Sequence, residues 1–224
     1  PTVFVVDADG ATRDAVRNLV HTMNLACETY TSGQEFLDAY APSRPGCVVL
    51  EVRIPDVSGL EIQERLAVQG AVIPLVFVTR ESTVSLAVRA MRAGALHFLV
   101  KPFREHELWD IIRESILLDA RRRRAAADRA KLDEQLAELT SEERQLVKMI
   151  AEGKSKQTIA SKMGVCVRTV ELRRNRAMAK LGLGSLRELE LLALTAFGEP
   201  LFTAADRSIV QARRGSALLA NRAV

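Results

Sequence analysis

Aromatic residues, cysteines and long apolar runs are all scarce in this chain of 224 residues. Aromatics make up only 4% of the chain, so its cores must consist mainly of Val, Leu, Ile and Ala. The apolar runs are short and broken by charge, which excludes a membrane-spanning helix and gives no layout typical of a secretion signal. Three scattered cysteines, Cys27, Cys47 and Cys166, each lie in an apolar pattern. They predict reduced, buried, structural thiols in a cytoplasmic protein.

The patterns of several common catalytic sites are also missing. Three scattered histidines and the lack of Cys-x-x-Cys pairs leave no zinc pattern. Neither a P-loop nor a nucleophile elbow is present. An enzyme that uses Asp7, Glu51 and Lys101 is the one catalytic alternative left open, and these absences argue against it. The sequence therefore predicts a protein that is not an enzyme.

Charge is divided unevenly along the chain. Residues 1–120 carry 11 Lys and Arg against 16 Asp and Glu, a net charge of −5. Residues 121–224 carry 21 Lys and Arg against 12 Asp and Glu, a net charge of +9. Such a split suggests an acidic module joined to a nucleic-acid binder, although a solvated basic surface would give the same charge.

The first 120 residues alternate between strand-like and helix-like segments. The strand-like segments are apolar almost throughout, and Ser32 is a candidate N-cap of one helix. This alternation is typical of a parallel sheet that helices cover on both faces. We therefore expect an α/β domain over 1–120, with a five-stranded, doubly wound parallel sheet. The expected strands are 2–6, 26–30, 47–50, 74–79 and 97–100.

A long helix is expected over 104–138. Gly and Pro are absent from 103 to 152, and the segment is rich in helix formers. Leu132, Leu136 and Leu139 are spaced as one stripe of a helix. The run Arg121–Arg124 is interpreted as a solvated stretch of this helical linker rather than as a nucleic-acid site.

Four short helices are expected over 139–196. Thr140 or Ser141 can cap the first, and glycines 153, 164 and 182 end the first three. Two short helices joined by a glycine-containing turn, the second rich in arginine, predict a helix-turn-helix. The remaining tail, 197–224, is assigned no function.

Several motifs together carry a family resemblance. The segments "VFVVDAD", "CVVLEVRIPDVSGLE", "VFVT" and "HFLVKPF" resemble, in this order, the receiver domain of two-component response regulators, with a flavodoxin-like or CheY-like fold. The segment "LTSEERQLVKMIAEGKSKQTIASKMGVCVRTVELRRNRAMAKLGLGS" resembles the LuxR-type helix-turn-helix. Their order resembles the FixJ/NarL class of transcription regulators, and the resemblance covers 1–120 and 138–195.

The receiver resemblance implies a phosphotransfer cleft. There a carboxylate at the end of the third strand takes a phosphoryl group from a histidine kinase, and two acidic residues hold Mg²⁺. The resemblance matches Asp7 and Ala8 to the two acids, and Glu51 to the phospho-accepting aspartate. It matches Thr79 and Lys101 to the hydroxyl and the lysine of the family's cleft. Phe98 matches the aromatic residue of the switch.

Two of these matches depart from the family pattern. Ala8 supplies no carboxylate, and Mg²⁺ tolerates poor oxygen coordination badly, so its binding is expected to be weak or absent. Glu51 carries its carboxylate roughly 1.3–1.5 Å farther into the cleft than Asp would, and a misplacement of about 1 Å can cost on the order of 10²-fold in rate. We expect Glu51 to pair with Lys101 and to serve as a built-in negative charge.

The second half is closer to the family pattern. The helix from Val167 to Lys180 is expected to enter the major groove of double-stranded DNA. Arg168, Glu171, Leu172 and Asn175 lie on one helical face and are the candidate base contacts. The candidate phosphate contacts are Lys154, Thr169, Arg173, Arg176 and Lys180. Val165, Val170, Met178 and Leu181 are assigned to the core.

The sequence thus predicts a cytoplasmic, DNA-binding transcription regulator with a degenerate receiver that works without phosphorylation. The resemblance implies a homodimer formed through 82–116, which the leucine stripe at 132–139 could extend. RNA polymerase is a further candidate partner, and a histidine kinase partner stays open. One alternative is a conventional response regulator switched by phosphotransfer. Another is an interaction module whose helix-turn-helix binds protein, against which the basic recognition helix argues.

Overall fold

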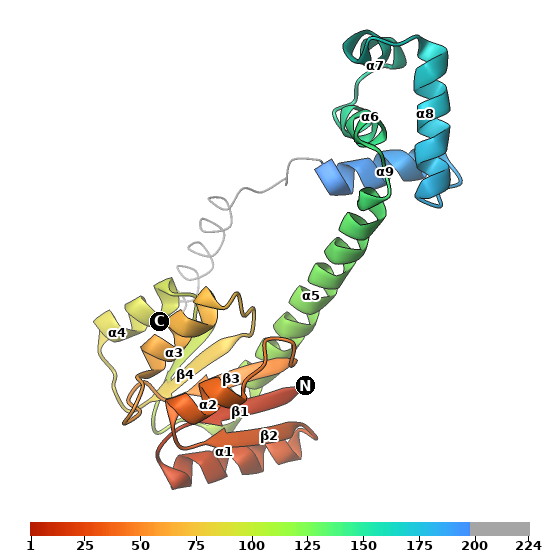
Figure 1. Cartoon of the computed structure of the whole chain (residues 1–224). Coiled ribbons are helices and arrows are strands. Elements are labelled where there is room, and N and C mark those ends of the chain that lie inside the picture. The colour runs from red at the N-terminus through yellow and green to blue at the C-terminus, as the bar shows by residue number, and fades with distance from the viewer. Residues whose placement is uncertain (198–224) are drawn as a thin grey trace, which may run out of the picture. The chain divides into compact units, whose positions relative to one another are not determined.

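A computed structural model describes residues 1–197 of the chain (Figure 1). The chain divides into two compact units: the first comprises residues 1–128, and the second begins at Arg129. Within the described residues, no helix is both long enough and apolar enough to cross a membrane.

The first unit is the expected α/β domain. All five strands pair in parallel, in the order β2-β1-β3-β4-β5. The strands are β1 (Thr2–Val6), β2 (Ala26–Tyr30), β3 (Gly46–Leu50), β4 (Leu75–Thr79) and β5 (His97–Val100). The helices between and after them are α1 (Gly10–Thr22), α2 (Gly33–Ala39), α3 (Gly59–Val68), α4 (Val84–Arg92) and α5 (Glu105–Ala137). The doubly wound fold is confirmed, and Ser32 caps α2 by accepting a hydrogen bond from the backbone N–H of Glu35.

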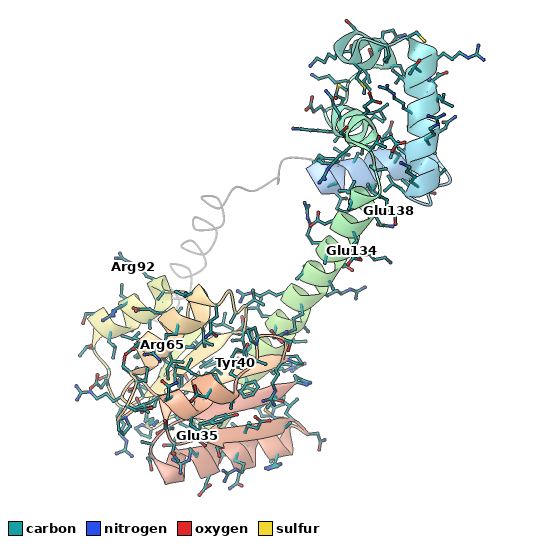
Figure 2. The ribbon with its side chains drawn as sticks, in the orientation of Figure 1. Glu35, Tyr40, Arg65, Arg92, Glu134 and Glu138 are labelled. Atoms are coloured by element: carbon teal, nitrogen blue, oxygen red, sulfur yellow. The ribbon has the colours of Figure 1, made fainter. Side chains whose placement is uncertain are left out.

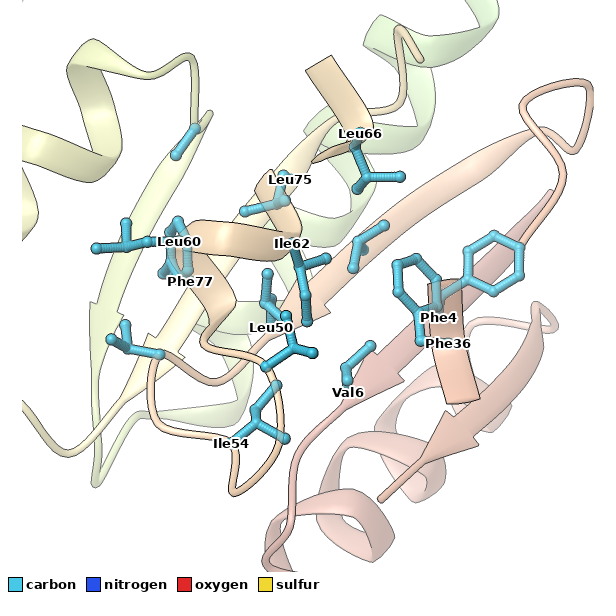
Figure 3. Close-up of a cluster of buried hydrophobic side chains, with 14 of the residues drawn as sticks. Phe4, Val6, Phe36, Leu50, Ile54, Leu60, Ile62, Leu66, Leu75 and Phe77 are labelled. Carbon is cyan, nitrogen blue, oxygen red and sulfur yellow. The ribbon is translucent and has the colours of Figure 1, made fainter. Parts of the chain in front are cut away.

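Two cores lie on the two faces of this sheet, because successive strand residues point to opposite sides. Phe4, Leu50 and Phe77 face α2 and α3, where they pack with Phe36 and Ile62 (Figure 3). On the other face the alternate strand residues pack against α1 and α5. That second cluster includes Val3, Val5, Val49, Val76, Val78, Val16, Leu108 and Ile112.

The second unit is a bundle of short helices. They are α6 (Ser141–Ala151), α7 (Lys156–Met163), α8 (Val167–Lys180) and α9 (Leu186–Phe197). Thr140 is the N-cap of α6 and forms a reciprocal capping box with Glu143. Gly164 ends α7 at φ 64°, a left-handed conformation that glycine adopts without strain, and so sets up the tight turn into α8. Val170 and Leu181 are buried as expected, and Val165 and Met178 pack against the same core.

The leucine stripe of the linker does not form a free surface. Leu132, Leu136 and Leu139 are buried in the core of the second unit, together with Leu146 and Leu189. The expectation that this stripe could extend a dimer contact is therefore wrong. A helical stripe of leucines predicts burial but does not identify the surface that buries it.

Two other expectations need correction. The three cysteines are free, but only Cys47 is buried. Cys166 is exposed because it is the non-helical N-cap of α8, where its thiol lies 3.2 Å from the hydroxyl of Thr169. Arg121 and Arg124 are exposed as expected of a solvated linker, but Arg123 is half-buried and donates hydrogen bonds to loop carbonyls of the first unit.

Candidate functional site

The cleft of the first unit lies where the strand order reverses. β1 and β3 are neighbours, with Val6 opposite Leu50, and the helices after them lie on opposite faces of the sheet. Ligands of open α/β sheets bind at this switch point, beyond the carboxyl ends of the strands. Asp7 and Glu51 are the next residues of these two strands, and the N–H of Glu51 donates to the carbonyl of Val6 at 2.9 Å. The fold therefore places both carboxylates in the cleft.

A lysine ammonium joins the two carboxylates. Lys101 follows β5, and its Nζ lies 2.6 Å from Oδ2 of Asp7 and 2.7 Å from Oε2 of Glu51. The three side chains are only 8%, 5% and 10% exposed, respectively. The expected Lys101–Glu51 pair is thus present, and Asp7 completes it. In comparable buried pairs, removal of one partner costs about 3–5 kcal/mol because it leaves an uncompensated buried charge.

Hydrogen bonds also occupy the second oxygen of the Glu51 carboxylate. Oε1 accepts the backbone N–H of Val52 at 2.7 Å and, more weakly, that of Arg53 at 3.4 Å. Each carboxylate oxygen therefore already has a partner within the protein. A nucleophilic oxygen would have to give up one of these contacts before it could attack a phosphoryl group.

The acids beside the first strand do not form a metal site. Ala8 has no ligand atom, and the neighbouring Asp9 caps α1 by accepting hydrogen bonds from the N–H of Ala11 and the hydroxyl of Thr12. The hydrogen bond from Thr12 is the main cause that lowers the pKa of Asp9, and Arg80 contributes as well. With Lys101 bound to both remaining carboxylates, these residues do not fit Mg²⁺, which needs a nearly octahedral set of oxygens. Within residues 1–197, no group of three or more His, Cys, Asp and Glu side chains could hold a metal ion.

Thr79 and Phe98 complete the cleft residues selected from the sequence. Thr79 is fully buried, and its hydroxyl accepts the N–H of Glu81 at 3.1 Å. Phe98 is half-buried, and its ring centroid lies 6.0 Å from that of Phe77. The peptide bond between Lys101 and Pro102 is cis.

The loop after Glu51 is held by a carboxylate at the start of a helix. Asp56 accepts hydrogen bonds from the backbone N–H groups of Gly33 and Gln34 and from the hydroxyl of Ser32. The N–H of Gln34 is the main cause that holds the pKa of Asp56 far below its usual range. Because α2 and this loop hold one another, the backbone that follows Glu51 has little freedom to move.

The candidate DNA-binding surface lies on α8. Val170 and Ala177 are buried on one side of the helix. The opposite side exposes Arg168, Leu172, Asn175 and Arg176, of which Leu172 is 51% exposed. Lys154 is exposed in the loop between α6 and α7. Cationic and amide side chains on an exposed helix face are suited to phosphates and base edges.

Three of the predicted DNA contacts are also partners within the domain. Glu171 pairs with Lys156 of α7, Arg173 pairs with Glu142 of α6, and Lys180 pairs with Glu143, each at 2.7 Å. Thr169 lies at the start of α8 beside Cys166. These ion pairs tie the recognition helix to the two helices before it, a role that the sequence analysis did not assign.

The partners Lys156 and Glu142 were not selected from the sequence. They lie 15 and 31 positions from their partners, Glu171 and Arg173, so no local spacing could identify them. The signal that did exist was the pair of acidic residues in the first turn of α6. Carboxylates in a first turn are also favoured by the helix dipole, so their presence alone did not point to α8.

Removal of Lys180 should destabilise the second unit. Glu143 is only 7% exposed in its side chain, and its carboxylate accepts hydrogen bonds from Lys180 and from the N–H of Thr140. We expect Lys180→Ala to lower the free energy of unfolding at pH 7 by about 1–2 kcal/mol, a modest value because Lys180 is partly solvated. Urea unfolding measures this, with the exposed Lys162→Ala as control.

The pH dependence of this loss follows from the carboxylate. The hydrogen bond from Lys180 is the main cause that lowers the pKa of Glu143 in the folded protein below its ordinary value of 4.5. A lowered folded pKa gives stability that is complete above the unfolded pKa and is lost as pH falls through the folded value. The difference between wild type and Lys180→Ala should therefore shrink below about pH 4.5. A difference that stays constant down to pH 2 would contradict this account.

Two family models match the chain, one in each unit. The model described as the response regulator receiver domain matches residues 3–113. The model described as bacterial regulatory proteins, luxR family, matches residues 137–193. The matched ranges cover the cleft and the recognition helix.

Curated relatives resemble nearly the whole chain. The transcriptional regulatory protein FixJ of Azorhizobium caulinodans is 37% identical over 194 residues, which are 87% of this chain and 92% of that protein. The transcriptional regulatory protein TdiR of Thauera aromatica is 34% identical over 188 residues, which are 84% of this chain and 83% of that protein. Both are named as transcriptional regulatory proteins and not as enzymes.

Solved structures of full-length regulators match as well. The response regulator StyR superposes with a TM-score of 0.76 at 38% identity, over 87% of this chain and 98% of that one. Full-length FixJ from B. japonicum gives a TM-score of 0.55 at 33% identity, over 87% of this chain and 96% of that one. The chain therefore belongs to the FixJ-like response regulators, DNA-binding transcription regulators that join a receiver domain to a LuxR-family domain.

Proposed function

We propose that the receiver of this transcription regulator is degenerate and acts without phosphorylation. The protein then binds double-stranded DNA as a constitutive homodimer in the cytoplasm. The observation that carries this proposal is the contact of the Lys101 ammonium with both Asp7 and Glu51, beside an alanine at the position of the second acid.

The charge balance of the cleft supports this reading. A bound cation or a phosphoryl group can shift a two-state equilibrium only through a difference in its interactions with the two states. Here the Lys101 ammonium compensates part of the negative charge of the two buried carboxylates, and Glu51 already provides a negative charge at the position of the acceptor. The cleft is thus held in one arrangement by groups that belong to the chain itself.

An apolar surface on α4 and β5 supports the dimer. Val84, Val88 and Met91 are spaced as one stripe of α4 and are 79%, 42% and 45% exposed. Val100, at the end of β5, is 38% exposed. These four side chains lie within 82–116, the region through which the resemblance implies pairing. Apolar side chains that gather on one exposed surface mark an interaction site.

The unmodified protein should therefore be a dimer at micromolar concentration. Light scattering coupled to gel filtration measures this, and acetyl phosphate with Mg²⁺ should not change the mass. Met91→Glu should convert the dimer to monomer, because it places a charge in the apolar stripe. Val68→Glu is the matched control, since Val68 is 90% exposed at the end of α3, outside the proposed interface. A wild-type monomer that dimerises only with acetyl phosphate would favour the conventional alternative.

A conventional response regulator stays the second candidate. Thr79, Lys101 and Phe98 occupy the positions that the family uses for phosphoryl binding and for the switch. Their presence is the observation in its favour. Direct phosphorylation separates the two candidates.

A further inference from the structure

A buried ion pair fastens the linker helix to the first unit. Asp119 of α5 is 1% exposed, although it lies beyond the predicted strands and the cleft. Both of its oxygens accept the Nε–H of Arg123, at 3.0 and 2.9 Å. Oδ2 also accepts the backbone N–H of Gly46 at 2.9 Å. This carboxylate therefore joins the linker helix to the first residue of β3.

The guanidinium of Arg123 extends this attachment, and the neighbouring Arg122 adds a hydrogen bond to the carbonyl of Val72 at 3.2 Å. The two terminal nitrogens of Arg123 donate to the carbonyls of Ser43 at 2.9 Å, Pro42 at 3.2 Å and Arg44 at 2.5 Å. Three consecutive carbonyls of the loop between α2 and β3 are thus bound by one side chain. Only a planar group with several fixed donors can serve a carboxylate and three carbonyls at once, which distinguishes arginine from lysine.

The loop that receives Arg123 is itself tightly held. Arg44 pairs with Glu28 of β2, and its guanidinium lies 4.7 Å from the ring centroid of Phe4. A side chain at Gly46 would meet the carbonyl oxygen of Thr2, because a Cβ built there lies 1.8 Å from it. Tyr40, labelled in Figure 2, caps α2 beside this loop, and burial raises the pKa of its phenol. The linker helix is therefore attached to a part of the sheet with little room to shift.

The attachment ends where the exposed part of the linker begins. Residues 124–131 of α5 are all exposed, and Leu132 is the next buried residue, in the core of the second unit. In the described part of the chain, the side-chain hydrogen bonds of α5 beyond Arg123 stay within the helix, between Arg129 and Asp133. The exposed span is thus eight residues long.

We propose that Asp119 and Arg123 are positioning residues that fix the origin of the linker and thereby set the spacing of DNA half-sites that the protein accepts. The pair, with the loop carbonyls it binds, is here called the linker clamp. While the clamp holds, the free span is limited to residues 124–131. When it is released, the helix can detach from the loop and the free span lengthens toward the receiver. A longer and more flexible connection tolerates more half-site spacings. This inference rests on the proposed function, since it requires a dimer that binds two half-sites.

The first test measures DNA affinity against half-site spacing. Half-sites recovered by selection with full-length wild-type protein are placed in pairs, and the spacer is varied in single steps over roughly one helical turn of about 10 base pairs. Wild type should show a marked optimum. Arg123→Ala should reduce the ratio between best and worst spacing by about tenfold, within the range that linker length and stiffness control. Arg124→Ala removes the same charge from the next position, which is exposed, and should leave the ratio unchanged.

Hydrogen exchange of the full-length protein tests the clamp without DNA. Backbone amides of 116–124 should exchange at least about tenfold faster in Arg123→Ala than in Arg124→Ala, because the released turn of helix can open locally. If Arg123→Ala does not fold, Asp119→Asn with Arg123→Gln removes both charges together and leaves no unpaired buried ion. That double variant should show the same direction of change in both measurements.

The outcomes separate the two proposals. If wild type yields no preferred DNA site, the proposed function fails, while hydrogen exchange still reports on the clamp. If wild type shows a spacing optimum that Arg123→Ala and the double variant leave intact, the positioning role is overturned and the proposed function stands. Equal exchange in Arg123→Ala and Arg124→Ala would overturn the clamp itself.

Discussion

Wild-type protein incubated with acetyl phosphate and Mg²⁺ will incorporate no phosphate at Glu51. The acceptor carboxylate is bound through one oxygen to Lys101 and through the other to the N–H of Val52. Mg²⁺ should neutralise the incoming phosphoryl group, but Ala8 provides no carboxylate to bind it. A misplacement of the reacting oxygen by about 1 Å already costs on the order of 10²-fold in rate, and the missing metal adds to that loss. Intact-protein mass spectrometry measures the incorporation.

Two variants separate the contributions of the two substitutions. Glu51→Asp alone should stay unphosphorylated, because Ala8 still deprives the metal of a ligand. Ala8→Asp combined with Glu51→Asp restores the acceptor and both acids. It should raise phosphate incorporation at least about 10²-fold above wild type. Stable incorporation in wild type, at a rate close to that of the double variant, would show that the site still works and would favour the conventional candidate.

Asn175→Ala should weaken binding to the best DNA site by about 1–3 kcal/mol and relax specificity at the base it reads. Asn175 is exposed on the same face of α8 as Arg168 and Leu172, whereas the opposite face is buried. An amide side chain can bind adenine through two hydrogen bonds in the major groove, which is why its loss affects one sequence more than others. Fluorescence anisotropy on the selected site and on single-base variants measures both effects.

Arg176→Ala provides the contrasting result. Arg176 is exposed beside Asn175 and is predicted to contact a phosphate, so its removal should weaken all sequences alike. The slope of log K against log salt should fall by roughly 0.9 for the one lost contact. Arg187→Ala, which removes an exposed arginine from α9, is the control and should leave the slope unchanged. Equal losses on all sequences for Asn175→Ala would contradict its role in base reading.

Glu51→Gln should perturb the cleft less than a simple Lys101–Glu51 pair would predict. If Glu51 were the only partner of Lys101, this variant would leave the ammonium unpaired. In the structure Lys101 keeps Asp7 at 2.6 Å, so the ammonium stays paired. The change therefore removes one negative charge without leaving a buried charge alone. Any loss of dimerisation or DNA affinity then reports the effect of that charge on the switch.

Local patterns in the sequence determined most of the fold. The expected strands agree with the five observed strands to within a residue at each end, because each is a short apolar run between turns. The sheet order places Asp7 and Glu51 side by side, and the resemblance had already placed them in one cleft. Even the Lys101–Glu51 pair was predictable, since a half-buried carboxylate needs a partner.

Only the tertiary structure shows which of these side chains pack or pair within the protein instead of facing a partner. Leu132 and Leu136 have the spacing of an interface, yet they belong to the core of their own domain. Lys180 has the position of a phosphate contact, yet it pairs with Glu143 from a helix 37 positions earlier. Arg123 is one of four identical residues in a row, and although its pair with Asp119 lies within one helix, its bonds to the carbonyls of residues 42–44 exist only in the folded chain. Periodicity and motif spacing determine which face of an element is apolar or charged, but the partner of that face comes from segments distant in the chain, so only the folded structure identifies it.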